Sequence, residues 1–372
     1  MKPETIEASG VRLRPLRDDD AADIEAASND PTIQRFLPKL PRPYTRDHAL
    51  TWLREVVPAQ WAAGGANYAI ADPATDRLLG AVGIARVDAD RGQGEIGYWA
   101  APWARGKGVT TAATRALADH AFGDGFGRLE ILADFANPAS IRVALAAGFE
   151  PEGVRRGAVV DPGNARRDVG VFARLATDPG EPIARALPDL PAGGLSDGGL
   201  ALRPVTPDDV DFYEELFNTP DILASHVPPV PPDREELELR CSRAQTRWLL
   251  GERIDLVMVD VETGAPAGDI GLYYQEPPTG QAMIGYSVLP AFRGRGFSRR
   301  AATLLARWTF ANTAIARLIA GTNPSNAGSQ RVLESAGFLR EGYQRNRLPG
   351  LAGGRIDDIL WALLPGDLRE TS

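Results

Sequence analysis

Two short stretches decide how this chain folds: Arg-Gly-Lys-Gly-Val-Thr at residues 105–110, and Arg-Gly-Arg-Gly-Phe-Ser at residues 293–298. Each follows a strand-like segment and runs directly into a helical pattern. A glycine loop at a helix start leaves backbone N–H groups unpaired at the positive end of the helix dipole. Because glycine has no Cβ, an anion can approach this backbone closely. Each stretch therefore predicts a cradle for a pyrophosphate group.

Both stretches belong to a long internal repeat. Five blocks return in the same order at an offset of 188 or 189 residues. A period of this length indicates duplication of a whole domain, whereas solenoid repeats span roughly 20–50 residues. The paired blocks begin at Leu13 and Leu202, Leu79 and Ala267, Ile96 and Ile284, Arg105 and Arg293, and Ala147 and Ala336.

The segment between the two copies is rich in proline and glycine. Proline stiffens a chain and glycine loosens it, so this composition is typical of a linker. The pattern predicts an N-terminal domain at residues 1–178, a linker at 179–198 and a C-terminal domain at 199–372. Within the linker, one helical turn is expected over residues 183–187.

Each copy is expected to form an α/β fold with a mixed sheet. In the first copy, helices are expected to end at Ala27, to begin after Thr45, and to cover 110–122 and 139–147. A meander of strands precedes strands that alternate with helices, a pattern that places helices on both faces of the sheet. The expected strands cover residues 11–16, 67–71, 78–87, 93–101, 129–135 and 169–175.

The composition excludes several classes of protein. The chain has 372 residues and a net charge of −8, and the basic footprint of a nucleic-acid-binding protein is absent. Its one cysteine, Cys241, permits no intramolecular disulfide, and its three histidines are far apart, so no metal site is expected. There is no apolar signal segment and no run of about 18 apolar residues. We expect a soluble, cytoplasmic protein that does not bind membranes.

A second polar element stands at a fixed distance from each glycine stretch. Asn137 and Ser140 open a helix 31 residues after Gly106, and Asn326 and Ser329 do the same 32 residues after Gly294. A single Asn-x-x-Ser is typical of a helix N-cap. Its recurrence beside both cradles indicates a binding role as well. The glycine spacing matches neither a P-loop nor a dinucleotide-binding fingerprint.

These motifs resemble the GNAT acyltransferase superfamily, in particular its RimJ/RimL-like branch. The resemblance covers nearly all of both copies, although Trp103 and Ala291 depart from its usual Gln or Arg. It implies two tandem acyl-CoA N-acyltransferase domains that bind acetyl-CoA, with the pyrophosphate on the glycine stretches and the pantetheine arm between splayed strands. The implied binding residues are Ala100, Arg105, Gly106, Lys107, Gly108, Val109, Thr110, Asn137 and Ser140, and Val288, Arg293, Gly294, Arg295, Gly296, Phe297, Ser298, Asn326 and Ser329.

Acyl transfer to an amine needs a proton acceptor for the amine and a proton donor for the leaving thiolate. Glu95 lies on the strand that leads into the first cradle, whereas the second copy has Met283 there. Glu95 is therefore the candidate general base, directly or through water, and Ser140 and Ser329 are candidate proton donors. Tyr98 and Tyr286 are interpreted as packing residues. The loops at 38–43 and 227–232 are expected to shape the acceptor pockets, and they differ between the copies.

The leading hypothesis is an N-acetyltransferase that moves acetyl from acetyl-CoA to a primary amine of a small molecule. One alternative acceptor is a protein N-terminus, as in ribosomal-protein acetyltransferases. Another alternative is a non-catalytic acyl-CoA-binding or regulatory module. The two copies are expected to form an internal pseudo-dimer in a monomeric chain. The loss of the glutamate in the second copy favours the first copy as the catalyst.

Overall fold

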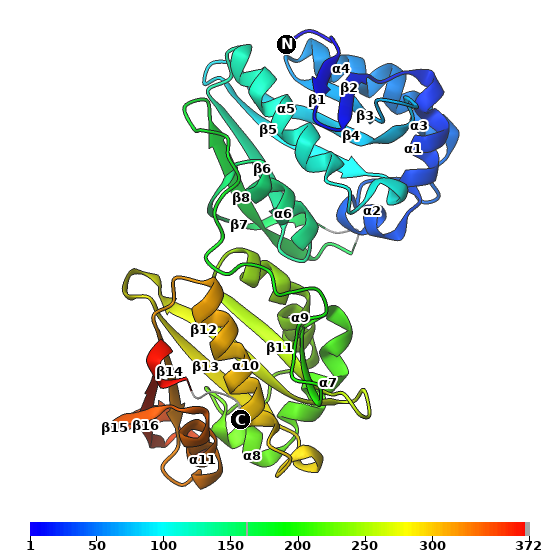
Figure 1. The fold of residues 1–372 in the computed structure, drawn as a ribbon. Helices are drawn as coiled ribbons and strands as arrows, with labels where there is room; N and C mark the ends of the chain where they lie inside the picture. The colour runs from blue at the N-terminus through cyan, green and yellow to red at the C-terminus, as the bar shows by residue number, and fades with distance from the viewer. Residues whose placement is uncertain (161–162, 369–372) are drawn as a thin grey trace. The chain divides into compact units, whose positions relative to one another are not determined.

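The computed structural model describes residues 1–160 and 163–368. The chain divides into two compact units, Met1–Ala184 and Arg185–Ser372, here called the N-terminal and C-terminal domains (Figure 1). Each contains a mixed sheet with the same arrangement, in which one pair of strands is parallel and the others are antiparallel. The repeated α/β fold predicted from the sequence is confirmed. No described helix is long and apolar enough to cross a membrane.

The sheet of the N-terminal domain has the strand order β1-β2-β3-β4-β5-β6-β8-β7. Strands β5 and β6 form its parallel pair. The elements of this domain are β1 (Ile6–Ala8), β2 (Val11–Pro15), α1 (Ala21–Ser28), α2 (Pro31–Phe36), α3 (Arg46–Thr51), α4 (Val57–Ala62), β3 (Ala66–Ala71), β4 (Leu78–Asp88), β5 (Gln93–Ala100), α5 (Val109–Gly123), β6 (Arg128–Asp134), α6 (Pro138–Ala146), β7 (Glu150–Val160) and β8 (Arg166–Leu175).

The C-terminal domain repeats this plan, with the strand order β15-β16-β14-β13-β12-β11-β10-β9. Strands β13 and β14 form its parallel pair. Its elements are β9 (Leu195–Ser196), β10 (Leu200–Pro204), α7 (Val210–Phe217), α8 (Pro220–Ser225), α9 (Arg234–Leu249), β11 (Arg253–Asp260), β12 (Pro266–Glu276), β13 (Gln281–Val288), α10 (Phe297–Asn312), β14 (Arg317–Thr322), α11 (Ala327–Ala336), β15 (Leu339–Pro349) and β16 (Arg355–Leu363).

Apolar side chains pack on both faces of the C-terminal sheet. Ile284 of β13 packs with Leu305 of α10 on one face. Tyr213 of α7 and Leu237 of α9 pack with Val257 of β11 on the other. Successive residues of a strand point to opposite faces. Met283 and Gly285 therefore face the side of the sheet that α7 and α9 cover.

Two details of the helices differ from the sequence predictions. The helix that follows Thr45 is interrupted by a π-helical turn over Trp52–Val56. Pro58 follows this turn in α4, and proline cannot donate the backbone hydrogen bond that a regular helix requires. The helical turn expected over residues 183–187 is wrong, because this segment has no helical conformation. Leu187 instead buries its side chain in the core of the C-terminal domain.

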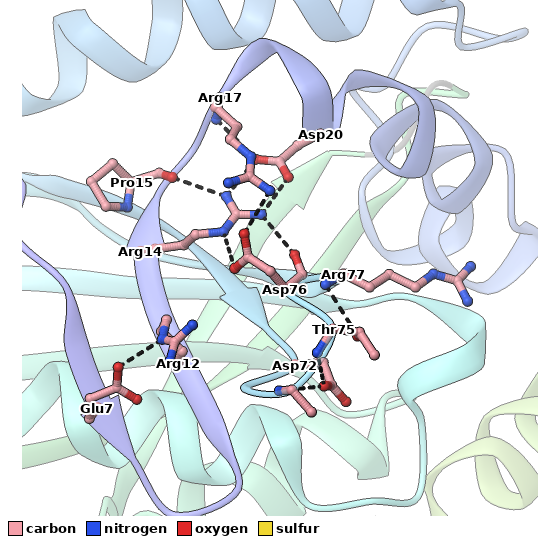
Figure 2. Close-up of polar contacts among 11 residues, drawn as sticks. Glu7, Arg12, Arg14, Pro15, Arg17, Asp20, Asp72, Thr75, Asp76 and Arg77 are labelled. Carbon is pink, nitrogen blue, oxygen red and sulfur yellow. Dashed lines mark hydrogen bonds and ion pairs between the residues drawn. The ribbon is translucent and has the colours of Figure 1, made fainter.

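A buried ion pair explains why Leu-Arg-Pro recurs at the start of each copy. The Arg14 guanidinium donates to both carboxylate oxygens of Asp20, at 2.9 and 2.7 Å, and its Nε donates to Asp76 at 2.9 Å (Figure 2). Arg203 binds Asp209 in the same two-pronged way, at 2.8 and 2.6 Å. The pair ties β2 of the N-terminal domain, and β10 of the C-terminal domain, to the turn that begins the next helix.

Replacing Asp20 by Ala is expected to lower the free energy of unfolding of the N-terminal domain by about 3 kcal/mol, because a buried Arg14 loses its main partner. The side chains of Arg14 and Asp20 are 8% and 4% exposed, so solvent screens the pair little. Urea denaturation measures the change, and Ala at the exposed neighbour Asp19 is the control. Equal stability of the two variants would contradict this assignment.

Candidate active site and coenzyme cradles

The sheet of each domain splits beside one strand. β5 pairs with β4 along its whole length, but its parallel pairing with β6 covers only Gln93–Glu95. β13 likewise pairs with β14 only over Gln281–Met283. Beyond these residues, one edge of each strand has no partner strand in the described part of the chain. Ala100 and Val288, two of the predicted binding residues, lie at the far ends of these edges. An extended ligand with amide groups can bind such an edge as an added strand.

The first glycine stretch forms an open loop before α5. Gly106 and Gly108 both adopt a φ of +72°, which favours glycine, and Gly108 caps the helix without a side-chain hydrogen bond. Apart from the adjoining backbone, no described atom lies within 4 Å of the place where a Cβ would stand on either glycine. The side chains of Val109 and Thr110 are buried, so Val109 can offer only its backbone N–H to a ligand.

The second glycine stretch has the same form before α10. Gly294 and Gly296 adopt a φ of +76°, and Gly296 caps the helix without a side-chain hydrogen bond. The positions of their absent Cβ atoms are equally open. Phe297 is buried and Ser298 lines the adjacent groove. Both cradles therefore present backbone N–H groups to an open space, which is the property that an anion site requires.

The basic side chains of both cradles are bound to acceptors of the protein itself. Arg105 pairs with Asp30 at 2.5 Å, and Lys107 donates to the carbonyl of Trp103 at 2.9 Å. In the C-terminal domain, Arg293 pairs with Asp221 at 2.8 Å and Arg295 with Asp260 at 2.9 Å. The hydrogen bonds from arginine lower the pKa of Asp30 and of Asp221. An incoming phosphate would therefore compete with carboxylates for these guanidinium groups.

The repeated Asn and Ser have different structural tasks. The Asn137 side chain accepts the Ser140 N–H at 3.2 Å and so caps α6, and Asn326 accepts the Ser329 N–H at 3.0 Å and caps α11. Each serine hydroxyl instead contacts a tyrosine hydroxyl of the neighbouring strand. The oxygen–oxygen distance is 3.0 Å for Ser140 and Tyr98, and 2.9 Å for Ser329 and Tyr286.

The tyrosines are therefore polar partners of the serines, a role that the packing interpretation missed. Burial raises the pKa of Tyr286 to about 12 and also raises the pKa of Tyr98, so both phenols keep their protons at neutral pH. The Tyr98 hydroxyl also lies 3.0 Å from the Ser140 carbonyl. The signal in the sequence was the return of Ile-Gly-Tyr at offset 188.

In the N-terminal domain, one cavity of about 590 Å³ extends from the two ends of the glycine stretch to the candidate base. Its lining runs from Arg105 and Thr110, past Tyr98 and Ser140, to Glu95. The loop at 38–43, expected to shape the acceptor pocket, contributes no residue to this lining, but its Leu40 lines a smaller cavity of about 150 Å³ that shares Ile33 and Trp99 with it. The preceding helix α2 lies closer and takes its place. Lining residues that the sequence reasoning missed are Ile33, Phe36, Arg86, Asp134, Arg155 and Arg167.

Glu95 is placed and held by the end of the β4–β5 hairpin. Its carboxylate accepts from Arg86 at 2.6 Å, and its side chain is 23% exposed. Arg86 has a φ of +49°, in the left-handed region that a side chain seldom adopts, and lies at a break in the β4–β5 register. Such a bulge redirects a side chain and often marks a functional site. Glu95 therefore reaches the cavity with a defined orientation.

The C-terminal domain has a groove of about 640 Å³ beside its own cradle. The groove is lined by the glycine stretch, by Tyr286, Asn326 and Ser329, and by Ile222 of α8. No residue of β14 or β16 belongs to this lining, and the loop at 227–232, expected to shape the pocket, does not belong to it either. Met283 occupies the place of Glu95.

Charged and aromatic side chains cluster on the α7 and α9 side of the C-terminal sheet. Arg240 lies 3.3 Å from a carboxylate oxygen of Asp255 and 3.7 Å from one of Asp269. Arg253 also pairs with Asp255, and its guanidinium lies 4.4 Å from the centre of the Tyr273 ring. Burial raises the pKa of Asp269 to about 6, although the charge of Arg240 acts in the opposite direction.

The raised pKa of Asp269 predicts a pH-dependent stability of the C-terminal domain. The folded state holds this proton more tightly than the unfolded state, where the pKa is near 3.8. The stabilisation is therefore complete below about pH 4 and is lost as the pH rises through about 6, by up to about 3 kcal/mol. Urea denaturation from pH 4 to 7 should show a flatter profile for Asp269→Asn than for the unchanged chain. Parallel profiles would contradict the prediction.

Comparison with known proteins finds a family match in each domain and two curated relatives. The family model described as "Acetyltransferase (GNAT) domain" matches residues 11–150 and again residues 200–339. Probable N-acetyltransferase YjcK of Bacillus subtilis (strain 168) is 40% identical over 86 residues, which are 23% of this chain. That match spans about half of YjcK, 48% of its length. Uncharacterized N-acetyltransferase p20 of Bacillus licheniformis is 26% identical over 155 residues, 41% of this chain and 86% of that protein.

Solved structures of similar fold each cover about half of the chain. The ribosomal-protein-S5-alanine acetyltransferase from Vibrio fischeri is 21% identical with a TM-score of 0.41, over 47% of this chain and 98% of that one. The spermidine N-acetyltransferase from Vibrio cholerae, solved with CoA and spermine, is 19% identical with a TM-score of 0.41, over 46% and 98%. The family model alone covers well over half of the sequence, in the two segments that carry the cradles. The chain therefore belongs to the acetyltransferase (GNAT) family, with two copies of the family's domain in tandem.

Proposed function

We propose that this protein is an N-acetyltransferase that moves the acetyl group of acetyl-CoA to a primary amine of a small molecule, in its N-terminal domain. The observation that carries the proposal is a cavity that is lined both by Glu95 and by Arg105 and Thr110, the two ends of the first glycine stretch. Family membership supports the use of acetyl-CoA. The cavity adds a place where a thioester and a proton acceptor can meet.

The coenzyme fits the residues that are present. Its diphosphate would bind the N–H groups of residues 106–110, which face an open space. Its pantetheine arm, which contains amide groups, would pair with the uncovered edge of β5 near Ala100. Arg105 could then exchange Asp30 for a phosphate oxygen. Asn137 supports this site by capping α6 and so positioning Ser140.

The chemistry assigned to the cavity needs no covalent enzyme intermediate. Glu95 accepts a proton from the amine, directly or through water, and the amine nitrogen attacks the thioester carbonyl. The C–N bond forms and the C–S bond breaks, so the products are the N-acetylated amine and CoA. Ser140 gives the leaving thiolate its proton and can regain one through Tyr98, whose hydroxyl lies 3.0 Å away. In the C-terminal domain, Ser329 and Tyr286 repeat this pair.

The acceptor end of the cavity indicates which amines fit best. Ile33 and Phe36 of α2 provide an apolar surface. The carboxylates of Glu95 and Asp134 are each already paired with an arginine, Arg86 and Arg167. A polycationic amine would gain little binding energy from carboxylates whose charges are already balanced by arginines. We therefore infer a small amine with an apolar body.

Transfer is tested by incubating the full chain with acetyl-CoA and a panel of amines, including amino acids, aminated aromatic compounds, polyamines and N-terminal peptides. Release of free thiol together with the mass of an acetylated product would support the proposal. Tight CoA binding without turnover on any amine would instead favour an acyl-CoA-binding module. Faster turnover on peptides than on small amines would favour the protein N-terminus as the acceptor.

A further inference from the structure

The two domains differ at one pair of facing strand positions. In the N-terminal domain, Glu95 of β5 pairs with Ala85 of β4. In the C-terminal domain, Met283 of β13 pairs with Tyr273 of β12 at the equivalent place. The C-terminal domain therefore lacks the carboxylate and carries a large aromatic side chain beside the same position.

The Tyr273 ring lies across the face of the sheet where an acceptor would approach. A Cβ added to Gly271 would meet ring atoms of Tyr273 at 3.0 Å, and one added to Gly285 would lie 3.7 Å from the same ring. Gly97, the counterpart of Gly285, has no described atom within 4 Å of that point, apart from the adjoining backbone, and lines the cavity. The tyrosine thus covers a surface that is open in the N-terminal domain.

Side chains of the C-terminal domain hold Tyr273 in this place. The Arg253 guanidinium lies 4.4 Å from the ring centre, and an Arg253 nitrogen lies 3.3 Å from the phenol oxygen. Arg253 is in turn paired with Asp255, which is 4% exposed. A cation held over an aromatic face by a buried carboxylate stabilises one orientation of the ring. Tyr273 is therefore held in a fixed position over this face of the sheet.

At the strand position equivalent to Glu95, the C-terminal domain has Met283 in place of a proton acceptor. The thioether of Met283 cannot accept the proton of an amine. The carboxylate of Asp269, which is 14% exposed, is four residues from Tyr273 along β12, a separation of roughly 13 Å in a strand. It faces Ser287, which pairs with it across the strands. Asp269 therefore does not lie where Glu95 lies in the N-terminal domain.

The part of the C-terminal domain that would bind the coenzyme has the same features as in the N-terminal domain. Gly294 and Gly296 form an open cradle, Ser329 contacts Tyr286, and the groove beside them has a volume of about 640 Å³. We propose that the C-terminal domain holds CoA or its acyl thioester without passing the acyl group on, because Tyr273 covers the acceptor side of β13. This inference rests on the proposed function of the N-terminal domain.

The test combines binding and transfer measurements on the full chain. Calorimetry with CoA is expected to give two sites for the unchanged chain and one site for Gly294→Trp. Glu95→Gln is expected to keep two sites and lose at least 99% of the transfer activity. Ala85→Tyr, which places the same cover in the N-terminal domain, is expected to keep two sites and lower transfer at least tenfold, with Ala85→Ser as the matched control.

Transfer above one-tenth of the original rate in both Glu95→Gln and Gly106→Trp would overturn the inference, because the C-terminal domain would then be catalysing. If adding Asp269→Asn to either of these variants removed the remaining transfer activity, Asp269 would be identified as the alternative base. Full activity of Ala85→Tyr would overturn the covering role of tyrosine. If the unchanged chain transfers to no amine, the proposed function fails separately. The CoA stoichiometry of Gly294→Trp then decides the inference. A loss of one bound CoA supports it, and an unchanged stoichiometry overturns it.

Discussion

Replacing Glu95 by Gln is expected to lower kcat for acetyl transfer by about 10²–10⁴-fold, which is the usual contribution of a positioned general base. The amide has nearly the same size as the carboxylate but cannot take a proton from the amine. The KM for acetyl-CoA should change little, because Glu95 lies on the face of β5 opposite to Tyr98 and Ser140. Initial rates at saturating acetyl-CoA, followed as thiol release, measure the effect.

The C-terminal domain supplies a matched control for this change. Met283 occupies the equivalent strand position, so Met283→Gln introduces the same side chain into the other domain. Its rate should equal that of the unchanged chain. A smaller than tenfold loss in Glu95→Gln, with normal folding by circular dichroism, would remove Glu95 from the mechanism and favour a solvated, structural glutamate.

Replacing Gly106 by Trp is expected to abolish both coenzyme binding by the N-terminal domain and transfer. The indole would fill the open space in front of α5, and the φ of +72° disfavours any residue with a Cβ. Hydrogen bonds to charged groups contribute about 1.5–3 kcal/mol each. Losing two of them should weaken CoA binding at that site by roughly 100-fold or more.

Calorimetry with CoA measures this loss as one missing site. Gly10→Trp is a suitable control, because Gly10 also has a positive φ, of +75°, and open space at its Cβ position, but lies outside both cradles and the cavity. A Gly106→Trp chain that binds two CoA molecules with unchanged affinity would show that the diphosphate does not rest on this loop.

Much of this architecture could be predicted from the chain alone, because the decisive signals are local. The glycine stretches, the Asn-x-x-Ser caps and the offset of 188 residues each lie in short segments, and they lead directly to two tandem domains of one family. Strand β7 was missed because its residues are largely exposed, so it lacks the alternation of apolar and polar residues that indicates a strand.

The acceptor sides could not be predicted, because they depend on contacts between segments far apart in the sequence. The pairing of Arg105 with Asp30 joins residues 75 positions apart. The position of Tyr273 over Gly285 depends on the register of two strands and on a guanidinium from a third. No pattern of residue types in the sequence predicts such an arrangement. The loops that looked most different in sequence, at 38–43 and 227–232, do not line the two large cavities, although Leu40 of the first loop lines a smaller one.

The short parallel pairing of β5 with β6 has a kinetic consequence. Because the two strands separate after Glu95, the opening between them is lined from both layers of helices, by Ser140 on one side and by Ile33 on the other. Donor and acceptor can enter from opposite faces and be present together. Double-reciprocal plots at several fixed amine concentrations should therefore intersect, as in a sequential mechanism, and radiolabelled acetyl groups should leave no mark on the denatured protein.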